Sequence, residues 1–363
     1  MLDGHKLNWH RDRVQAWLKG ERIAPITIDA ALTRRCTYKC VYCYGQLQAN
    51  DEKRMTKDVI FRFLDDAAEI GVKAISFVSD GESTCSPHLY DAILRGKSNG
   101  LDMALGTNGY LLKDERLEDI LPALTYLRFN ISAGDPVRYV QIMGAPQNAF
   151  NKVCNTIKEC VRIKQEKKLE VTLGMQMVLM PQFADQIIPF VNLGKQLGVD
   201  YAVIKHCSDD EKGSLGIDYS KYFDLVDVLK EAEGYSTKDY LVRVKWSKVL
   251  SGGKRQYKCC YGPPFIIQLS GSGLVAPCGM LFNERFKKFH IGNIVDTPFK
   301  EIWKSDRYWQ VMDLIASNKF NAQKECGSLC LQHKVNEFLW DLKQGKISLG
   351  DPRAESPMHV NFI

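Results

Sequence analysis

Three cysteines lie close together in the first part of the chain, at Cys36, Cys40 and Cys43. They follow the apolar run at residues 26–32, which has the composition of a β-strand. A loop that leaves a strand can gather three thiolates around one centre, which is one ligand fewer than a cubane iron–sulfur cluster needs. A structural zinc site is the alternative, but it would need a fourth ligand, and no nearby cysteine or histidine supplies one. The spacing therefore predicts a reactive iron–sulfur centre with one open position.

The elements around these cysteines alternate short apolar runs with amphipathic segments, which is typical of βα units and a parallel sheet. We expect six strands, at residues 26–32, 73–79, 101–107, 126–132, 171–179 and 201–207. Helical patterns occupy residues 56–70, with Thr56 as N-cap, and residues 87–98, 114–123, 148–166 and 183–197. The predicted fold class is α/β, a partial (β/α)6 barrel whose active site lies at the C-terminal ends of the strands.

Glycines and polar residues stand at or near the C-terminal ends of these predicted strands. They make a mouth in which the backbone can approach a ligand closely. They are Asp80, Gly81 and Glu82 after the second strand, Asn108 after the third, Asn130 and Ser132 on the fourth, Gln176 on the fifth, and Lys205, His206 and Cys207 on the sixth.

Beyond residue 207 we expect the βα alternation to stop. Residues 218–233 look helical, residues 240–249 alternate like a strand, and residues 265–277 read as a hairpin with a glycine turn. Helices are expected from residue 297 to about 317 and at 331–344. This pattern predicts an α+β extension of one hairpin plus helices. The expected divisions are a lead-in at 1–21, the barrel at 22–207, the extension at 208–345 and a C-terminal tail at 346–363.

The first cysteine set, with the aromatic Tyr42 before its third member, resembles the motif of the radical S-adenosylmethionine (SAM) superfamily. The turn Asp80-Gly81-Glu82 extends the resemblance, although the family usually has two glycines before the glutamate, and so does Thr107-Asn108-Gly109. The resemblance implies a [4Fe-4S] cluster whose open iron binds SAM and reduces it to a 5′-deoxyadenosyl radical. It implies contacts of Gly81 and Glu82 with the SAM amino group, and of Asn130 or Ser132 with its ribose or carboxylate. We also expect Tyr42, Asp80, Asn108, Gln176 and Lys205 at this cofactor site.

Five later cysteines form a second set, which surrounds the segment Gly273-Leu274-Val275-Ala276-Pro277-Cys278. This set resembles the SPASM and shorter twitch extensions of the same superfamily, although its last pair is separated by three residues instead of the usual two. Five cysteines suffice for one auxiliary [4Fe-4S] cluster. Neighbouring side chains on an extended segment point to opposite faces, so Cys259 and Cys260 are not expected to bind together. We predict Cys260, Cys278, Cys326 and Cys330 as ligands, with a four-cysteine zinc site as the alternative.

From this resemblance we predict an oxidoreductase-type radical SAM enzyme that abstracts a hydrogen atom from a small polar metabolite and dehydrogenates it. The auxiliary cluster would take the electron. One alternative is a radical epimerase in which Cys85, Cys207 or Cys259 returns a hydrogen atom. A peptide-modifying (RiPP) maturase is a second, although only 35 residues precede Cys36, where many maturases carry a peptide-recognition domain. A non-catalytic iron–sulfur or zinc protein is a third.

The composition fits such an enzyme. The net charge of +6 is small for 363 residues and spread along the chain, which argues against a nucleic-acid-binding surface. No apolar run approaches the roughly 18 residues that would span a membrane, and no export signal is present, so we expect a cytoplasmic protein. In that setting the 12 cysteines argue for metal ligands and buried thiols rather than disulfides. The expected electron donor is of the flavodoxin or ferredoxin type.

Overall fold

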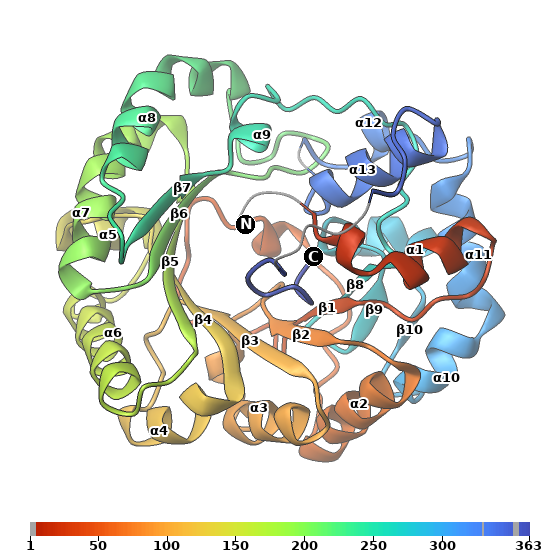
Figure 1. Cartoon of the computed structure of the whole chain (residues 1–363), viewed down its shortest axis with the longest axis horizontal. Helices are drawn as coiled ribbons and strands as arrows, with labels where there is room; N and C mark the ends of the chain where they lie inside the picture. The colour runs from red at the N-terminus through yellow and green to blue at the C-terminus, as the bar shows by residue number, and fades with distance from the viewer. Residues whose placement is uncertain (1–4, 329, 351–355) are drawn as a thin grey trace.

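The computed structural model describes residues 5–328, 330–350 and 356–363. Residues 1–4 of the predicted lead-in and 351–355 of the predicted tail lie outside this part. A single sheet runs through the molecule, with the strand order β10-β9-β8-β1-β2-β3-β4-β5-β6-β7. The sheet curves into an open barrel, and the helices lie on its outside (Figure 1). The predicted α/β partial barrel is confirmed.

All six predicted barrel strands are present, and each is hydrogen-bonded in parallel to the next. Their outer faces bury apolar side chains such as Ile28, Phe77 and Leu127 against the helices. Their inner faces carry polar residues instead. The strands are β1 (Thr27–Ala30), β2 (Ala74–Phe77), β3 (Asp102–Thr107), β4 (Leu124–Asn130), β5 (Thr172–Leu179) and β6 (Tyr201–His206).

The βα alternation continues one unit further than predicted. Segment η7 (Tyr219–Leu225) and helix α8 (Val226–Gly234) lead to β7 (Leu241–Val244), which pairs in parallel with β6. The predicted strand at 240–249 therefore ends at Val244, and Trp246–Val249 form helix α9. Glu233 at the end of α8 fixes this change, because its carboxylate accepts hydrogen bonds from Val244 N and Trp246 Nε1, both at 2.9 Å.

The predicted hairpin of the extension is present, and it joins the barrel sheet. Strand β8 (Ile266–Leu269) pairs in parallel with β1, β9 (Leu274–Ala276) pairs antiparallel with β8, and β10 (Gly292–Asn293) completes this edge. Barrel and extension therefore share one continuous set of backbone hydrogen bonds.

The predicted helices of the barrel are largely confirmed. Thr56 caps α2 through a hydrogen bond from Val59 N, as expected. Helix α5 was missed, although Asp135 at its N-cap and Pro136 at its first position are a recognisable start signal. The barrel helices are α2 (Lys57–Ile70), α3 (Leu89–Ser98), α4 (Leu117–Ile120), α5 (Pro136–Met143), α6 (Ala149–Glu166) and α7 (Ile187–Leu197).

Two further departures concern the extension and the start of the chain. The predicted helix at 297–317 is divided into α10 (Phe299–Lys304) and α11 (Asp306–Ala316), because Ser305 between them is extended and caps α11. A helix that was not predicted, α1 (Arg11–Leu18), precedes the barrel. The remaining elements of the extension are α12 (Ala322–Glu325) and α13 (His333–Lys343).

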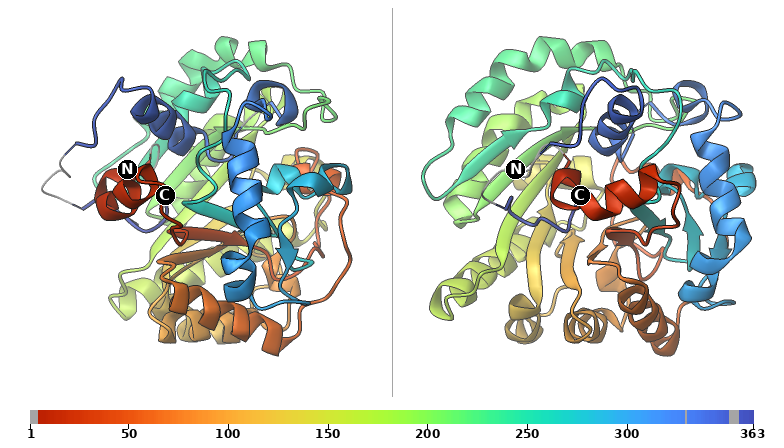
Figure 2. Two further views of the ribbon diagram at one scale, coloured as in Figure 1. Left: turned by 90° about the vertical axis from the view of Figure 1, so that its right-hand side faces the viewer. Right: turned by 45° about the vertical axis from the view of Figure 1, so that its right-hand side comes forward.

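Residues 356–363 pack under the N-terminal ends of the barrel strands, and Figures 1 and 2 show the chain end beside β1. The Thr27 hydroxyl donates to the Asn361 carbonyl at 2.7 Å, and the Asn361 amide donates to Asp102 at 2.8 Å. The Phe362 ring contacts Tyr126 edge-on at 5.0 Å between centroids. This segment of the predicted tail therefore forms a floor for the barrel.

The helices of the described residues were also compared with the length and hydropathy that a membrane span requires. None of them meets both criteria.

Candidate active site

Cys36, Cys40 and Cys43 lie on the cluster loop, residues 31–43, which runs from the end of β1 to the short helix η2 (Tyr44–Leu47). Cys43 N donates to Cys40 O at 3.1 Å, which turns the end of the loop. Burial raises the pKa of all three thiols, that of Cys36 to about 11. A bound iron would reverse this shift, because a metal holds its cysteine ligands as thiolates.

Two glycines hold the cluster loop from two different elements. A Cβ atom on Gly81, just after β2, would lie 2.0 Å from Thr33 O, and one on Gly271, in the β8–β9 turn, would lie 2.1 Å from the Thr33 carbonyl carbon. Both positions must therefore be glycine for the loop backbone to pass so close. The loop is fixed by the barrel and by the extension together.

Replacing Gly271 with alanine is expected to lower the free energy of unfolding by about 1–3 kcal/mol, because the new methyl group overpacks against the loop backbone. Denaturant unfolding of the two proteins measures the difference. Gly234→Ala is the matched control, since a Cβ there meets nothing within 4 Å. Equal stability of Gly271→Ala and Gly234→Ala would contradict the contact.

Glu82 ties the end of β2 to the end of β3 through its buried carboxylate. Oε1 accepts hydrogen bonds from the Thr107 hydroxyl at 2.7 Å and from the Thr84 hydroxyl at 2.8 Å, and Oε2 accepts from Asn108 N at 2.7 Å. Asn108 in turn donates its amide to the Thr37 hydroxyl of the cluster loop at 3.1 Å. The predicted cofactor residues Glu82 and Asn108 thus meet beside Cys36.

Asp80, also predicted at the cofactor site, directs its carboxylate to the extension. It accepts hydrogen bonds from the Ser270 hydroxyl at 2.6 Å and from Gly271 N at 2.9 Å, and Arg34 Nε lies 3.5 Å away. Burial raises the pKa of Asp80, and these donors oppose the rise. The contacts join the cluster loop, β2 and the hairpin.

The other predicted cofactor residues lie along β4 to β6 and near the cluster loop. Gln176 donates its amide to Asn130 Oδ1 at 3.2 Å across β4 and β5, and the Ser132 hydroxyl accepts from Val178 N at 3.1 Å. The Tyr42 hydroxyl is buried and lies 2.8 Å from a methionine sulfur, Met143 Sδ. Lys205 lies near the C-terminal end of β6.

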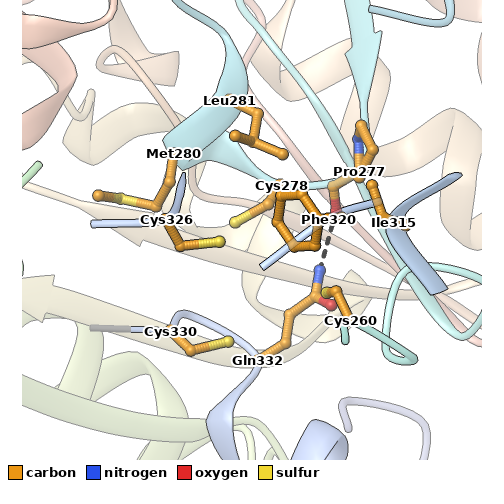
Figure 3. Close-up of a pocket in the computed structure, with 10 residues that line it drawn as sticks. All are labelled: Cys260, Pro277, Cys278, Met280, Leu281, Ile315, Phe320, Cys326, Cys330 and Gln332. Atoms are coloured by element: carbon orange, nitrogen blue, oxygen red, sulfur yellow. Dashed lines mark hydrogen bonds between the residues drawn. The ribbon is translucent and has the colours of Figure 1, made fainter. Parts of the chain in front are cut away.

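The predicted auxiliary ligands Cys260, Cys278, Cys326 and Cys330 line one pocket (Figure 3). They come from three segments of the extension, since Cys326 and Cys330 are close in sequence, and their thiols face a common space whose other walls are mostly apolar. Among the described residues, no three His, Cys, Asp or Glu side chains converge closely enough to hold a single metal ion. The pocket walls, by contrast, carry four thiols, which is the donor set of a cubane cluster.

Two polar side chains adjoin these thiols. Asn336 on α13 directs its amide at Cys330 Sγ from 3.4 Å, and its carbonyl oxygen accepts from Tyr261 N at 2.7 Å. Arg255 is held near the same pocket by a hydrogen bond to the Gly327 carbonyl. Its pKa is raised, because the thiolates of Cys330 and Cys326 outweigh the opposing effect of burial. Hydrogen bonds and charge at the sulfurs are the features that set cluster potentials.

The adjacent cysteines 259 and 260 point in different directions. Cys260 faces the pocket, whereas Cys259 Sγ lies 3.4 Å from the Ser317 carbonyl. We expect Cys260→Ala to lower the iron content of the reconstituted protein from about eight to about four atoms, the difference of one cubane. The matched variant Cys259→Ala should keep the full content. An iron assay measures both, and a loss in Cys259→Ala alone would reverse the assignment.

The two other candidate hydrogen donors lie near the cluster loop. Cys85, in η3 (Ser83–Cys85), is half-buried, and the backbone of Thr37 lies beside its thiol. Cys207 is fully buried, with its Sγ 3.6 Å from the Tyr42 carbonyl. Burial raises the pKa of Cys207 to about 12. Their predicted role as hydrogen donors stays a prediction.

A short polar path connects the inner face of the barrel with the auxiliary pocket. Gln268 on β8 donates its amide to Asp29 Oδ2 on β1 at 3.3 Å, and its Oε1 accepts from Gly279 N at 2.5 Å. Gly279 directly follows Cys278, one of the pocket thiols. A Cβ on Gly279 would lie 3.3 Å from the hydroxyl of Tyr44, the residue after Cys43. The two cysteine sites therefore share a boundary.

Sequence reasoning missed three of the residues on the inner faces of the strands: Asp29, Arg128 and Gln268. Each is a polar residue at an alternate position of an otherwise apolar strand, in the runs Thr27–Ala30, Leu124–Asn130 and Ile266–Leu269. In a barrel whose outer face is covered by helices, such a position points inward. The two-residue alternation of side chains along each strand could therefore have identified these three residues as pointing inward.

Comparison with known proteins agrees with this geometry. Residues 31–193 match the family described as the radical SAM superfamily, and residues 259–331 match the SPASM family, described as an iron-sulfur cluster-binding domain. The chain therefore carries a radical SAM domain at residues 31–193. A SPASM-type extension follows it at residues 259–331. These two domains imply a [4Fe-4S] cluster that binds SAM and an auxiliary iron–sulfur cluster, as predicted.

Named relatives cover most of the chain at low identity. The tungsten-containing aldehyde ferredoxin oxidoreductase cofactor-modifying protein of Pyrococcus furiosus is 21% identical over 76% of this chain and 80% of its own length. The AdoMet-dependent heme synthase of Methanosarcina barkeri is 25% identical over 78% of this chain and 83% of its own.

Two solved structures share the fold. Streptococcus suis SuiB bound to S-adenosylmethionine has a TM-score of 0.64 at 17% identity. The match covers 84% of this chain and 72% of the SuiB chain. The structure of anSMEcpe with AdoMet and a peptide has a TM-score of 0.58 at 16% identity. The match covers 89% of this chain and 97% of the anSMEcpe chain.

Proposed function

We propose that this radical SAM protein is an oxidoreductase that removes a hydrogen atom from a small polar metabolite and dehydrogenates it, with the auxiliary cluster as electron acceptor. When bound, SAM and the first cluster supply hydrogen-atom abstraction, and the auxiliary cluster supplies an acceptor for one electron. The observation that carries the proposal is the polar path from Asp29 through Gln268 to Gly279, because it joins the barrel interior to the residue after Cys278.

The ligand set of the auxiliary pocket supports an electron-transfer role. Four thiols complete the coordination of a cubane and leave no open position for substrate. The walls around them, including Leu281, Ile315 and Phe320, are apolar and limit the access of water. Arg255 and Asn336 add a positive charge and a hydrogen-bond donor near the thiols, and both favour the reduced, more negative state.

Asp29 is suited to take up the proton that dehydrogenation releases. Its side chain lies on the inner face of β1, and Gln268 holds one of its carboxylate oxygens. Burial raises the pKa of Asp29 to about 7, although the charges of Arg128 and Lys205 oppose the shift. A carboxylate with a pKa near neutrality can accept a proton at the pH of the reaction. The substrate thereby loses a hydrogen atom, a proton and an electron, which together equal two hydrogen atoms.

The names of two sequence relatives bear on the substrate. One describes modification of a cofactor and the other describes synthesis of heme, and both are small molecules. This supports a small molecule as the substrate class of the present chain.

Reconstituted, reduced enzyme should be incubated with fractions of an anaerobic metabolite extract in deuterated water. We expect one fraction to stimulate release of 5′-deoxyadenosine and to yield a product that is lighter by two hydrogen atoms and carries no solvent deuterium on carbon. A product with unchanged composition and carbon-bound solvent deuterium would contradict oxidation and favour the epimerase. Loss of that deuterium in one of Cys85→Ala, Cys207→Ala or Cys259→Ala would then identify the hydrogen donor.

A further inference from the structure

Two cations face the interior of the barrel, Arg128 on β4 and Lys205 on β6. In the register of the sheet, Arg128 stands between Gly106 on β3 and Gly174 on β5. Gly106 makes room for the guanidinium, because a Cβ there would lie 3.2 Å from Arg128 Nη2. Gly174 makes room for the Tyr201 ring, whose Cζ would lie 2.1 Å from such an atom. The two glycines therefore let the guanidinium of Arg128 and the ring of Tyr201 lie against the inner face of the sheet.

Neither cation has a hydrogen-bonded or ion-paired partner among the residues that the structure describes. Arg128 Nε is buried and unpartnered, and the nearest ring, Tyr126, lies 6.0 Å from the guanidinium carbon. Asp29 interacts electrostatically with both cations, yet no ion pair forms and one of its oxygens is held by Gln268. Both side chains are partly removed from water, and a desolvated charge without a partner is costly, so the pair calls for a ligand.

The electrostatics of Lys205 point in the same direction. Burial lowers the pKa of Lys205 to about 7, and the positive charge of Arg128 adds to the effect. An anion between the two side chains would offset both causes, because it replaces lost hydration and screens the repulsion.

Arg128 lies above a closed floor, and Lys205 stands further up the barrel, four residues beyond Tyr201, which is level with Arg128. The Tyr126 ring, two residues before Arg128 on the same face of β4, contacts the rings of Phe362 and His359 at 5.0 and 5.2 Å. In the other direction Asn130, predicted at the SAM site, lies two residues further along the same face, or roughly 7 Å. A ligand held by Arg128 would thus lie between the floor and the predicted SAM site.

We propose that Arg128 and Lys205 bind an anionic group of the substrate, a carboxylate or a phosphate, in the interior of the barrel. The guanidinium can hold such a group with two parallel hydrogen bonds, and the ammonium adds a third. The inference rests on the proposed function in one respect, since it takes the barrel interior as the substrate site. The same chemistry could also serve the carboxylate of SAM itself, so the test separates the two sources.

The test measures binding without turnover, in reconstituted enzyme that holds SAM and receives no reductant. Calorimetry compares a panel of anions, such as malonate, citrate and a phosphate monoester, with neutral counterparts of the same shape, such as malonamide. We expect at least one anion to bind more tightly than its counterpart. Its affinity should fall about tenfold or more in Arg128→Met and in Lys205→Met, the loss of one charge-assisted hydrogen bond. Lys195→Met, on the exposed surface of α7, should bind like the unmodified protein.

Three outcomes would overturn the proposal. The first is that no anion binds more tightly than its neutral counterpart. The second is that Lys205→Met and Arg128→Lys, the variants least disruptive to folding, bind the anion as well as the unmodified protein does. The third is that the variants lose affinity for SAM and not for the anion, which would assign the pair to the SAM carboxylate. Failure of the proposed oxidation would instead be read from the product of the reduced enzyme, so the two hypotheses fail separately.

Discussion

Release of 5′-deoxyadenosine is expected to fall to the background of a protein-free reaction when Cys43 is replaced with alanine. Cys43 ends the cluster loop and is one of the three predicted cysteine ligands of the first cluster, and its N–H donates a hydrogen bond to the Cys40 carbonyl. A cluster with two remaining cysteine ligands does not present one open iron in a defined position. Anaerobic incubation with SAM and a reductant, followed by chromatography of the nucleosides, measures the effect.

Cys154→Ala is the control for this experiment. Cys154 lies on α6 among buried apolar residues and is remote in sequence from both cysteine sets. Replacing it with alanine makes the same chemical change as Cys43→Ala, the loss of one thiol. The control should release 5′-deoxyadenosine as the unmodified protein does. If Cys43→Ala also kept that rate, the cluster loop would not be the site of SAM cleavage.

Replacing Cys278 with alanine is expected to separate the two halves of the proposed reaction. The cluster loop is untouched, so reduction should still release 5′-deoxyadenosine. The dehydrogenated product should disappear, because the auxiliary pocket loses one of its four thiols and the residue that adjoins the path to Asp29. Both compounds are measured in the same reaction. The ratio of dehydrogenated product to 5′-deoxyadenosine should be close to one in the unmodified enzyme and near zero in the variant.

Met280→Leu is the matched control, since Met280 lines the same pocket without supplying a thiol and leucine has a similar volume. Its product ratio should equal that of the unmodified protein. An unchanged ratio in Cys278→Ala would show that the electron leaves by another route.

The barrel could be predicted from sequence because each strand is a short apolar run and each helix has a periodic apolar face. The helix and the strand of the seventh unit were predicted, but their place in the barrel sheet and the end of the strand were not. Residues 240–249 alternate like one strand, yet a tertiary contact, the carboxylate of Glu233, ends β7 and begins α9. The division between α10 and α11 was likewise hidden, because Ser305 is neither glycine nor proline.

The cysteine sites were easier to predict than the barrel interior. Cluster ligands lie in recognisable spacings, and the alternation of side chains along an extended segment predicted that Cys259 and Cys260 do not bind together. Arg128 and Asp29 carry no such spacing. Their significance appears only when the register of the sheet places Arg128 between two glycines and Gln268 beside Asp29. Sequence separation is large in each case, so the alternation along a strand can show that these side chains point inward but not which residues they meet.

The pairing of β8 with β1 bears on how electron transfer between the two cluster sites could be controlled. The cluster loop leaves the end of β1, and Cys278 follows β9, so the two predicted ligand segments extend from strands of one sheet that are separated only by β8. Their separation is set by backbone hydrogen bonds and cannot vary as it would between hinged domains. An electron therefore cannot be withheld by holding the two centres apart. In the proposed reaction, the arrival of the substrate in the barrel would therefore set when the electron moves.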